Sequence, residues 1–591
     1  MDAAAESRTR TDPVMTEIVR NGVIAVTEEM KTNLMRTAYN LIIYEALDFT
    51  TGLFTATGET VSIGMGLPMF IRGMAATLKA KLAHFGAEGL EPGDILITND
   101  GYVTGSHLNH VTVSLPIFHE GKLVAFACCM AHWLTVGGVL SGMTTDIFSE
   151  GLQIPILKLQ SKGKLNDDLV DIIKMNVHLP ERAMGDLRAQ LTAVRTGERR
   201  FLELCNRYGA EVVLNAIADI MDHSERAARE RTRSIPDGTY EAESFMDDDG
   251  IEIGKRIPIR VRVVVSGDEF TVDLSEVSRQ VRGFYNSGPT TGYGCAQVAY
   301  KCVASPTDYP INDGSFRPLK VILPAGRVVS AVKPAPLKLW MTIPMTIVDT
   351  VFKALAPAIP DRVAAGHHAD LGIPQMHGYL AEQRRLFIVS SGPIGGGWGA
   401  KSSEDGMSAV VCINDGDTHN SPVEMLETKN PILIDHFRLV EDSGGAGRHR
   451  GGLGAEYRFT ARTEIMLNTR IERVHCAPWG LQGGGSGTGN RVELFVGGEH
   501  KKNLPNAKVL SQRLLPDEGF IVRAAGGGGF GAAWQRPAAR VAEDVRQGYV
   551  TIEAAARDYG VVLDPETLAV DEDATERRRA QMRDGRNQGA T

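Results

Sequence analysis

The character of the sequence changes near residue 236, and this change constrains the fold more than any other feature. Before it, apolar residues recur with helical spacing or form short strand-like runs. Pro236-Asp237-Gly238 then marks a turn, and from there to about residue 535 the chain is rich in Gly, Pro and short β segments. The pattern predicts an α/β (α+β) fold, with an N-terminal mixed α/β region, a large β-rich region and a helical C-terminal tail.

These patterns divide the chain into four predicted ranges. They are a disordered N-terminus at 1–11, an α/β domain at 12–235, a β-rich Gly-containing domain at 236–537 and a charged helical tail at 538–591. Asp12 is expected to cap a helix that begins at Pro13. Residues 165–232 are expected to be helical with a break at Pro180, and residues 256–273 to form a hairpin around Gly267-Asp268.

Bulk composition excludes several classes of protein. A net charge of -9 and a pI near 6.0 argue against nucleic acid or an anionic membrane as the main partner. No apolar run approaches the roughly 20 residues that a membrane helix needs. Residues 1–11 show no secretory signal, and the seven cysteines include no CxxC pair, so a cytoplasmic protein is expected. Cys128 and Cys129 are interpreted as small buried residues of a strand.

The best candidate for a chemical site lies within residues 99–138. His107 and His110 are three residues apart, and His132 stands at the far end of the next predicted strand. A hairpin can bring these positions together, and three converging imidazoles are a common divalent-metal arrangement. Asp48, in an earlier strand, could supply an oxygen ligand. The alternative interpretation is a pair of polar loop histidines and one core histidine.

Three other features have simpler explanations. Residues 392–402 read GPIGGGWGAKS, but Ala400 stands where a phosphate-binding loop needs Gly, so these glycines are interpreted as tight turns. His367-His368 with Asp370 form a weak pocket candidate, because adjacent side chains of an extended chain point in opposite directions. His119 precedes Glu120-Gly121 and is assigned to an exposed hairpin turn.

Several phrases agree with one family along most of the chain. They are NDGY at 99–102, EGLQIP at 150–155, GDLRAQLTAVRTGERR at 185–200, SPVEMLE at 421–427, DSGGAGRHRGGLG at 442–454, PWGLQGG at 478–484 and GGGGFG at 526–531. Together they resemble the hydantoinase B/oxoprolinase family from about residue 12 to 565. The family includes subunits of N-methylhydantoinases, caprolactamase, and acetone or acetophenone carboxylases.

The resemblance implies a partner and a metal. The partner would be a hydantoinase A-like subunit that binds ATP and Mg, and the substrate a lactam, a hydantoin or a ketone. The family's metal ligands fall on Asp48, His107, His110 and His132. Two positions depart from the family pattern: His110 replaces the Asp of HLPD, and Thr135 stands where an Asp is common. The His-rich set favours Zn, with Mn as the second choice.

Three functions are compatible with these features. The first is the metal-binding B-type subunit of a heteromeric ATP-dependent cyclic-amide hydrolase. The second is a subunit of an ATP-dependent ketone carboxylase, since both reactions need a phosphorylated oxygen and a nearby cation. The third is a scaffold subunit with a degenerate metal site. The first two predict a hetero-oligomer, with two copies of each subunit, and no ATP hydrolysis by this chain alone.

Overall fold

The computed structural model describes residues 10–588, apart from 141–142, 305–310, 414–415 and 417. It separates the chain into two compact units. Unit 1 comprises 1–240, 260–344 and 414–419, and unit 2 comprises 241–259, 345–413 and 420–591. Most of the predicted disordered N-terminus lies outside the described residues, and the linear division into four ranges remains a prediction. Within the described part, no helix is long and apolar enough to span a membrane.

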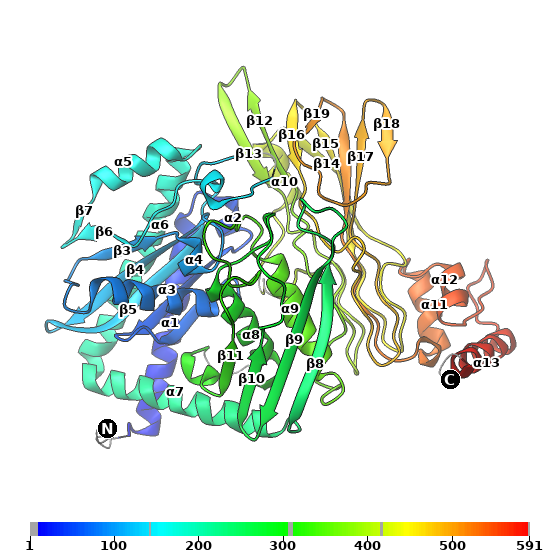
Figure 1. Cartoon of the computed structure of the whole chain (residues 1–591), viewed down its shortest axis with the longest axis horizontal. Coiled ribbons are helices and arrows are strands. Elements are labelled where there is room, and N and C mark those ends of the chain that lie inside the picture. The colour runs from blue at the N-terminus through cyan, green and yellow to red at the C-terminus, as the bar shows by residue number, and fades with distance from the viewer. Residues whose placement is uncertain (1–9, 141–142, 305–310, 414–415, 417, 589–591) are drawn as a thin grey trace. The chain divides into compact units, whose positions relative to one another are not determined.

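The first part of the chain is a mixture of helices and strands, as predicted. Its elements are α1 (Pro13–Thr37), α2 (Leu41–Tyr44), β1 (Phe49–Thr55), β2 (Thr60–Met65), α3 (Phe70–Phe85), β3 (Ile95–Thr98), α4 (Gly101–Thr104), β4 (His110–His119), β5 (Lys122–His132), the 3-10 turn η1 (Ile147–Glu150), β6 (Leu157–Ser161), β7 (Lys164–Leu165), α5 (Asp167–Asn176), α6 (Pro180–Tyr208) and α7 (Ala210–Arg233). The strands form one sheet in the order β2-β1-β5-β4-β3-β6-β7. Strands β3 to β7 of this sheet are labelled in Figure 1.

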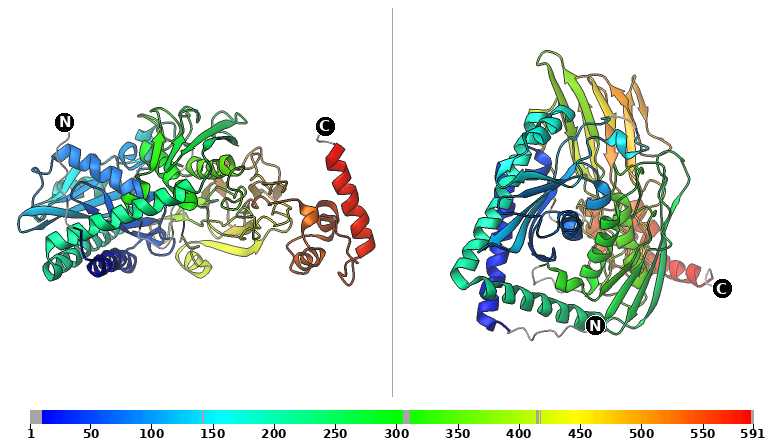
Figure 2. Two further views of the ribbon diagram at one scale, coloured as in Figure 1. Left: turned by 90° about the horizontal axis from the view of Figure 1, so that it is seen from below. Right: turned by 60° about the vertical axis from the view of Figure 1, so that its left-hand side comes forward.

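Alternation along the strands gives this sheet two different faces. Val111 and Val113 belong to the apolar core shared with α1 and α6, which lie side by side against the sheet (Figure 2). Thr112 and Ser114 point to the opposite face, where α3 packs. Because His110 has the same parity as Thr112, its side chain belongs to the α3 face.

Local sequence signals act as predicted at several boundaries. The Asp12 carboxylate accepts hydrogen bonds from the amides of Val14 and Met15 at the start of α1, where Pro13 is the first helical residue. Pro180 begins α6 after the break that follows α5. Glu120 and Gly121 join β4 to β5 with φ angles of 49° and 78°, the left-handed pair of a tight hairpin turn.

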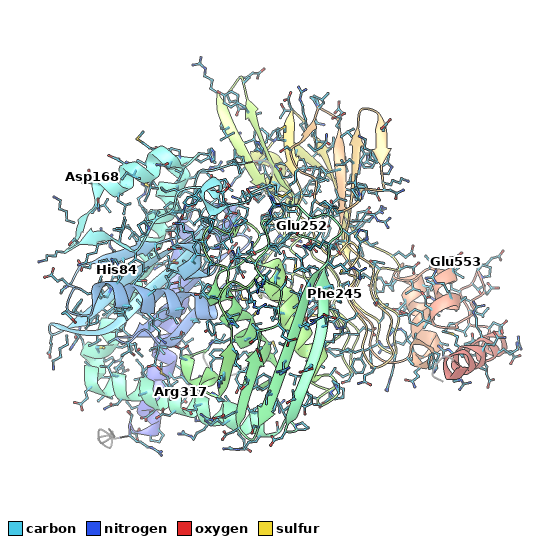
Figure 3. The ribbon with its side chains drawn as sticks, in the orientation of Figure 1. His84, Asp168, Phe245, Glu252, Arg317 and Glu553 are labelled. Carbon is cyan, nitrogen blue, oxygen red and sulfur yellow. The ribbon has the colours of Figure 1, made fainter. Side chains whose placement is uncertain are left out.

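The middle of the chain adds a second sheet and two helices. Its elements are β8 (Gly238–Met246), β9 (Ile257–Ser266), β10 (Glu269–Asp273), α8 (Pro289–Ala304), the 3-10 turn η2 (Asp313–Phe316), β11 (Leu319–Ile322) and α9 (Thr342–Leu355). The sheet order is β11-β10-β9-β8, and β9 and β10 form the predicted hairpin. Arg317, labelled in Figure 3, follows η2 and donates to Asp222 and Glu225 of α7 at 3.0 and 2.9 Å.

The last part of the chain is dominated by strands and ends in helices. Its elements are β12 (Gln375–Leu380), β13 (Arg385–Ser390), α10 (Val423–Lys429), β14 (Ile432–Leu439), β15 (Ala455–Ala461), β16 (Ile465–Asn468), β17 (Arg491–Val496), β18 (Glu499–Lys501), β19 (Gln512–Leu514), β20 (Gly519–Arg523), the 3-10 turn η3 (Ala533–Gln535), α11 (Ala538–Arg546), α12 (Ile552–Asp558) and α13 (Glu572–Gln588). The strands form two sheets, β13-β12-β16-β19 and β14-β15-β20-β17-β18, over a common apolar core.

The Gly-rich stretches of unit 2 pack directly against one another. The Gly527 amide donates to Gly452 at 2.9 Å, and the Gly527 carbonyl accepts from Gly445 at 2.8 Å. A Cβ placed on Gly397 would lie 1.9 Å from the Gly452 carbonyl oxygen, and one on Gly451 would lie 1.9 Å from that of Gly527. These glycines are therefore required for close backbone approach. We call the four stretches 392–399, 444–454, 483–489 and 526–531 the glycine layer.

A buried charge cluster attaches the C-terminal helices to the rest of unit 2. Arg536, only 2% exposed, donates to both carboxylate oxygens of Asp405 at 2.7 and 2.8 Å. Its Nε donates to Asp544 of α11 at 2.9 Å. The bidentate geometry fixes the guanidinium in one orientation. The tail, which carries Glu553 in Figure 3, thus has a specific attachment as well as a small apolar core of its own.

One buried lysine makes a pH-dependent contribution to the stability of unit 1. Lys81 of α3 is fully buried, and its Nζ donates to the Thr112 carbonyl and the Ser114 hydroxyl at 3.0 Å each. Burial disfavours the charged ammonium and lowers the Lys81 pKa to about 7. In the unfolded chain, the lysine pKa is about 10.4. Between these values the unfolded state binds the extra proton.

We therefore expect the stability of the wild type to rise with pH relative to Lys81→Met. The free energy of unfolding should gain up to about 1.4 kcal/mol per pH unit above pH 7, because only the unfolded state holds the proton there. At pH 7 and below, Lys81→Met should be the more stable protein, since it buries no charge. Thermal unfolding midpoints of both proteins at pH 6, 7, 8 and 9 measure this difference. Parallel pH profiles would show that Lys81 is not responsible.

Candidate functional site

The structure brings the three histidines predicted from their spacing into one cluster. His110 begins β4 and His132 ends β5, and the two residues lie directly opposite each other in the antiparallel register. His107 lies in the preceding turn, where its carbonyl accepts from the His110 amide at 3.2 Å. The ring centroids are 4.6 Å apart for His107 and His110, 4.8 Å for His107 and His132, and 5.0 Å for His110 and His132. We call these residues the three-His cluster.

Asp48 lies beside this cluster at the start of β1. Leu47 has a φ of 59°, so the chain turns sharply just before the aspartate. The Asp48 carbonyl accepts from the His132 amide at 3.1 Å, and Phe49 then pairs with Ala131. The Asp48 carboxylate is 2.9 Å from Nε2 of His110. In this geometry Asp48 anchors the His110 ring.

Two aromatic side chains cover the cluster. Phe70, the first residue of α3, meets the His110 ring edge-on at 4.6 Å between centroids. Trp340 stacks on Phe70 at 5.4 Å and lies 5.6 Å from His110 and 6.2 Å from His107. The rings of the cluster are thereby shielded from bulk water on this side, which strengthens any electrostatic interaction made there.

The hydrogen bonds fix which ring nitrogens carry protons. Nδ1 of His107 is 3.2 Å from the Lys338 carbonyl oxygen, which can only accept, so Nδ1 holds the proton and Nε2 keeps a lone pair. Nε2 of His110 likewise donates to Asp48, so the tautomer that fits this contact has its lone pair on Nδ1. His107 Nε2, His110 Nδ1 and His132 Nδ1 are all buried without a hydrogen-bond partner.

Burial favours the neutral form of two of the imidazoles, His107 and His132. It lowers the pKa of His107 well below the usual value, and it lowers the pKa of His132 to about 4. Burial alone would raise the pKa of Asp48, but the neighbouring His110 and His132 lower it below its usual value. Near pH 7 His107 and His132 are therefore neutral and the Asp48 carboxylate is ionised, the protonation states that metal ligands need.

The kinds of donor atom present fit a divalent ion, but their positions in this structure are not those of a coordination shell. Three buried imidazole nitrogens lack partners, and an anionic carboxylate orients one of the rings. Among the described residues, no group of three or more His, Cys, Asp or Glu side chains is placed so that it could hold a metal ion without movement of the side chains. Thr135, one of the two departures from the family pattern, is hydrogen-bonded to Nδ1 of His178 at 2.7 Å.

The other candidates from the sequence fall elsewhere. His119 lies beside the hairpin turn, as predicted, but its ring is half-buried because it contacts Asn206 at 3.1 Å. His367 is held by Asp349, whose carboxylate lies 2.6 Å from Nδ1, while the His368 ring is turned by 77° and lies 5.7 Å away. Gly397 in the stretch 392–402 is surrounded by the backbone of the glycine layer, as expected of a structural glycine.

Sequence reasoning missed the residues that surround the three-His cluster. Phe70, Trp340 and Lys338 reach it from segments far from the β4–β5 hairpin. No spacing rule connects a helix start near residue 70 with a loop near residue 340. The sequence held one indirect signal, the phrase EGLQIP that resembles the family. Its first residue, Glu150, accepts a hydrogen bond from the Lys338 amide and so belongs to the surroundings of the cluster.

Comparison with known proteins establishes the family. The sequence profile of the hydantoinase B/oxoprolinase family matches residues 12–533. The chain is 32% identical to the beta chain of caprolactamase from Pseudomonas jessenii, over 96% of this chain and 99% of that protein. The chain therefore belongs to the hydantoinase B/oxoprolinase family.

Solved and curated relatives agree with this assignment. The crystal structure of ATP-dependent caprolactamase from Pseudomonas jessenii superposes with a TM-score of 0.90 and 29% identity, covering 97% of this chain and 100% of the matched chain. A putative B-type subunit of a D-/L-hydantoinase from a Pseudomonas strain is 28% identical over 93% of this chain and 95% of its own. The acetophenone carboxylase delta subunit of Aromatoleum aromaticum is 26% identical over 91% of this chain and 84% of its own.

Proposed function

We propose that this chain is the metal-binding B-type subunit of a heteromeric ATP-dependent hydrolase of cyclic amides. The observation that carries the proposal is the three-His cluster with its three unpartnered ring nitrogens beside Asp48. Full-length similarity to a caprolactamase chain favours the lactam or hydantoin class of substrate over the ketone class. The partner would be a hydantoinase A-like subunit that binds ATP and Mg, with two copies of each chain in the complex.

The chain's own residues would hold and orient the ion. His107 through Nε2, His110 through Nδ1 and His132 through Nδ1 are the proposed donors, with Asp48 anchoring His110. A divalent ion bound there would polarise a substrate oxygen or lower the pKa of a water molecule. The Asp48 carboxylate and the Lys338 carbonyl keep protons on the outer ring nitrogens, so the inner nitrogens remain free to bind.

The donor set also selects the kind of metal. Imidazole nitrogen favours Zn over Mg, and Mn is the second choice because it accepts the same ligands with lower affinity. His110 in place of the family's carboxylate removes one negative charge from the site. The compensating anion is Asp48, which lies 2.9 Å from His110.

The carboxylase alternative is retained because the acetophenone carboxylase subunit, although more distant at 26% identity against 32%, matches 91% of this chain. In that reaction the same cluster would face an enol phosphate and carbon dioxide derived from bicarbonate. The scaffold alternative requires only that the three-His cluster binds no ion. Each alternative predicts a different outcome for the same experiment.

We expect the co-purified complex of this chain and its A-type partner to hydrolyse ATP when a lactam or hydantoin is present, without bicarbonate. The product should be the ring-opened acid, identified by mass spectrometry, and metal analysis should find one ion for each copy of this chain. Turnover that requires bicarbonate and consumes a ketone would instead establish the carboxylase. A complex without bound metal would support the scaffold.

The isolated chain provides the control. It should show no substrate-stimulated ATP hydrolysis, because the nearest approach to a phosphate-binding loop has Ala400 before Lys401 and lies in the glycine layer. Light scattering of the active complex should give a mass that corresponds to a heteromer. An active monomer of this chain would contradict the subunit assignment.

A further inference from the structure

Glu150 is a buried carboxylate outside the three-His cluster, at the end of η1. It is 1% exposed and comes from the EGLQIP phrase, none of whose side chains belongs to the cluster. Burying a carboxylate is costly unless hydrogen bonds satisfy it. The hydrogen bonds that satisfy the Glu150 carboxylate therefore indicate its structural role.

The Glu150 carboxylate holds the backbone of the segment that covers His107. Its Oε1 accepts from the Leu337 amide at 3.0 Å, from the Lys338 amide at 2.9 Å and from the Thr144 hydroxyl at 2.8 Å. Oε2 also accepts from Leu337, at 3.1 Å. Two consecutive amides bound to one carboxylate hold the chain up to Lys338. The Leu339 amide, which shares a peptide plane with the Lys338 carbonyl, donates to the Phe284 carbonyl at 3.0 Å, so the two anchors together fix the direction of the Lys338 carbonyl.

The fixed carbonyl is the one that contacts His107. It lies 3.2 Å from Nδ1, and because a carbonyl can only accept, the contact selects the tautomer with the proton on Nδ1. The lone pair is then on Nε2, the buried nitrogen that has no partner. If the Lys338 carbonyl turned away, neither the orientation nor the tautomer of the ring would be specified.

Glu150 also lies against the chain segment that follows His132. The Leu152 amide donates to the Val136 carbonyl at 2.8 Å, and the Val139 amide donates to Ser149 at 3.0 Å. A Cβ on Gly138 would lie 2.5 Å from the Glu150 backbone carbon, so only Gly allows this approach. Glu150 therefore lies between the Leu337–Lys338 segment, which contacts His107, and the segment that follows His132.

We propose that Glu150 is a positioning residue that presents Nε2 of His107 for metal binding, by ordering the Leu337–Lys338 backbone. The inference rests on the proposed metal site, but its structural part concerns the His107 tautomer and does not require a bound ion. It assigns a role to a carboxylate that touches neither metal nor substrate.

The test compares Glu150→Leu with Glu150→Gln in the full chain. Leu removes every acceptor, whereas Gln keeps Oε1, which receives all three donors. For Glu150→Leu we expect zinc affinity, measured by competition with a chelator, to fall about 10- to 100-fold, the range for outer-shell partners of ligating histidines. Glu150→Gln should recover most of the affinity, and Thr144→Val, which removes one donor only, should stay within about threefold of wild type, well short of that range.

A second readout separates this inference from the metal site itself. Nitrogen NMR of ¹⁵N-histidine-labelled, metal-free protein, with His107→Asn to assign the signal, reports which ring nitrogen holds the proton. We expect Nδ1–H in the wild type and in Glu150→Gln, and a tautomer mixture in Glu150→Leu. If wild type binds no zinc but shows this pattern, the metal proposal fails and the positioning role stands.

The inference is overturned if Glu150→Leu folds with the wild-type tautomer and unchanged zinc affinity. Should Glu150→Leu fail to fold, Glu150→Asp serves in its place, because it keeps the charge but shortens the side chain by one methylene. Unchanged affinity and tautomer in Glu150→Asp would then count against the proposal in the same way.

Discussion

Replacing His132 with Ala should abolish metal binding and turnover together. The ring lies directly opposite His110 in the hairpin and supplies one of the three buried nitrogens without a partner. Its removal leaves two imidazoles, too few to hold an ion against water at micromolar concentration. We expect metal content, measured by plasma mass spectrometry of the purified complex, to fall from one ion per chain to background. Substrate-dependent ATP hydrolysis should fall to background with it.

Assembly should survive this substitution, which distinguishes loss of metal from loss of fold. His132 ends β5, so its truncation leaves the β4–β5 ladder intact. His119→Ala is the matched control, because it removes a histidine from the other end of the same hairpin, where it contacts Asn206. That variant should keep metal and activity. Full metal content in His132→Ala would show that the three-His cluster is not the site.

His110→Asp adds a third arm to this experiment. It restores the carboxylate that the family usually has at this position, but it also removes the ring that Asp48 anchors at 2.9 Å. Retained binding would mean that a carboxylate and an imidazole are interchangeable as the ligand here. Lost binding, with His132→Ala also metal-free, would mean that Asp48 and His110 act as a pair peculiar to this chain.

The parts of this site that the sequence could predict are those connected by short-range rules. Strand alternation and the two-residue turn at Glu120-Gly121 predict the β4–β5 hairpin and bring the ends with His110 and His132 together. The exact pair depends on a bulge between Ile117 and Phe118, which shifts the register by one residue; without it His110 would face Ala131. His107 follows because it is three residues away. The helix boundaries at Pro13 and Pro180 were predictable for the same reason, since caps and prolines act locally.

The covering residues depend on tertiary packing and could not be predicted in this way. Trp340 stacks on Phe70 although the two lie in distant parts of the sequence, and Glu150 binds amides of Leu337 and Lys338. No periodicity encodes such contacts. The anchoring role of Asp48 also needed coordinates, because only the 2.9 Å contact with His110 shows it.

The role of the glycines could be predicted from the sequence only in part. Their abundance after residue 236 predicted tight turns, and the structure adds that several stand where backbones meet without room for a Cβ. In the glycine layer, residues distant in sequence bond amide to carbonyl, as Gly527 does with Gly452 and Gly445. Which glycines are essential is therefore a property of the packed layer, and the sequence alone does not rank them.

Gly527→Ala should consequently destabilise unit 2 severely. The added Cβ would lie 1.9 Å from the Trp398 carbonyl oxygen and 2.2 Å from its carbon, and both are backbone atoms. They cannot move aside easily, because the same carbonyl accepts from the Gly452 amide at 2.9 Å and the Trp398 indole donates to Val411. Overpacking usually costs about 1–3 kcal/mol. A backbone clash without relief should exceed about 4 kcal/mol, in the exceptional range for one substitution.

Gly485→Ala is the control from the same layer. A Cβ there would meet its nearest atoms, the amide nitrogen and carbonyl oxygen of Ala446, at 3.4 Å, an ordinary contact distance. Both variants add one methyl group to a glycine-rich stretch, so they differ mainly in the space available. Thermal unfolding and limited proteolysis of the full chain should show Gly485→Ala close to wild type. Gly527→Ala should be recovered poorly, or unfold at least about 10 °C lower, since 1 kcal/mol shifts the midpoint by about 2–4 °C in domains of this size. Equal thermal unfolding midpoints for the two variants would mean that the backbone of the glycine layer can move to accept the methyl group. Its close backbone contacts would then not determine the fold of unit 2.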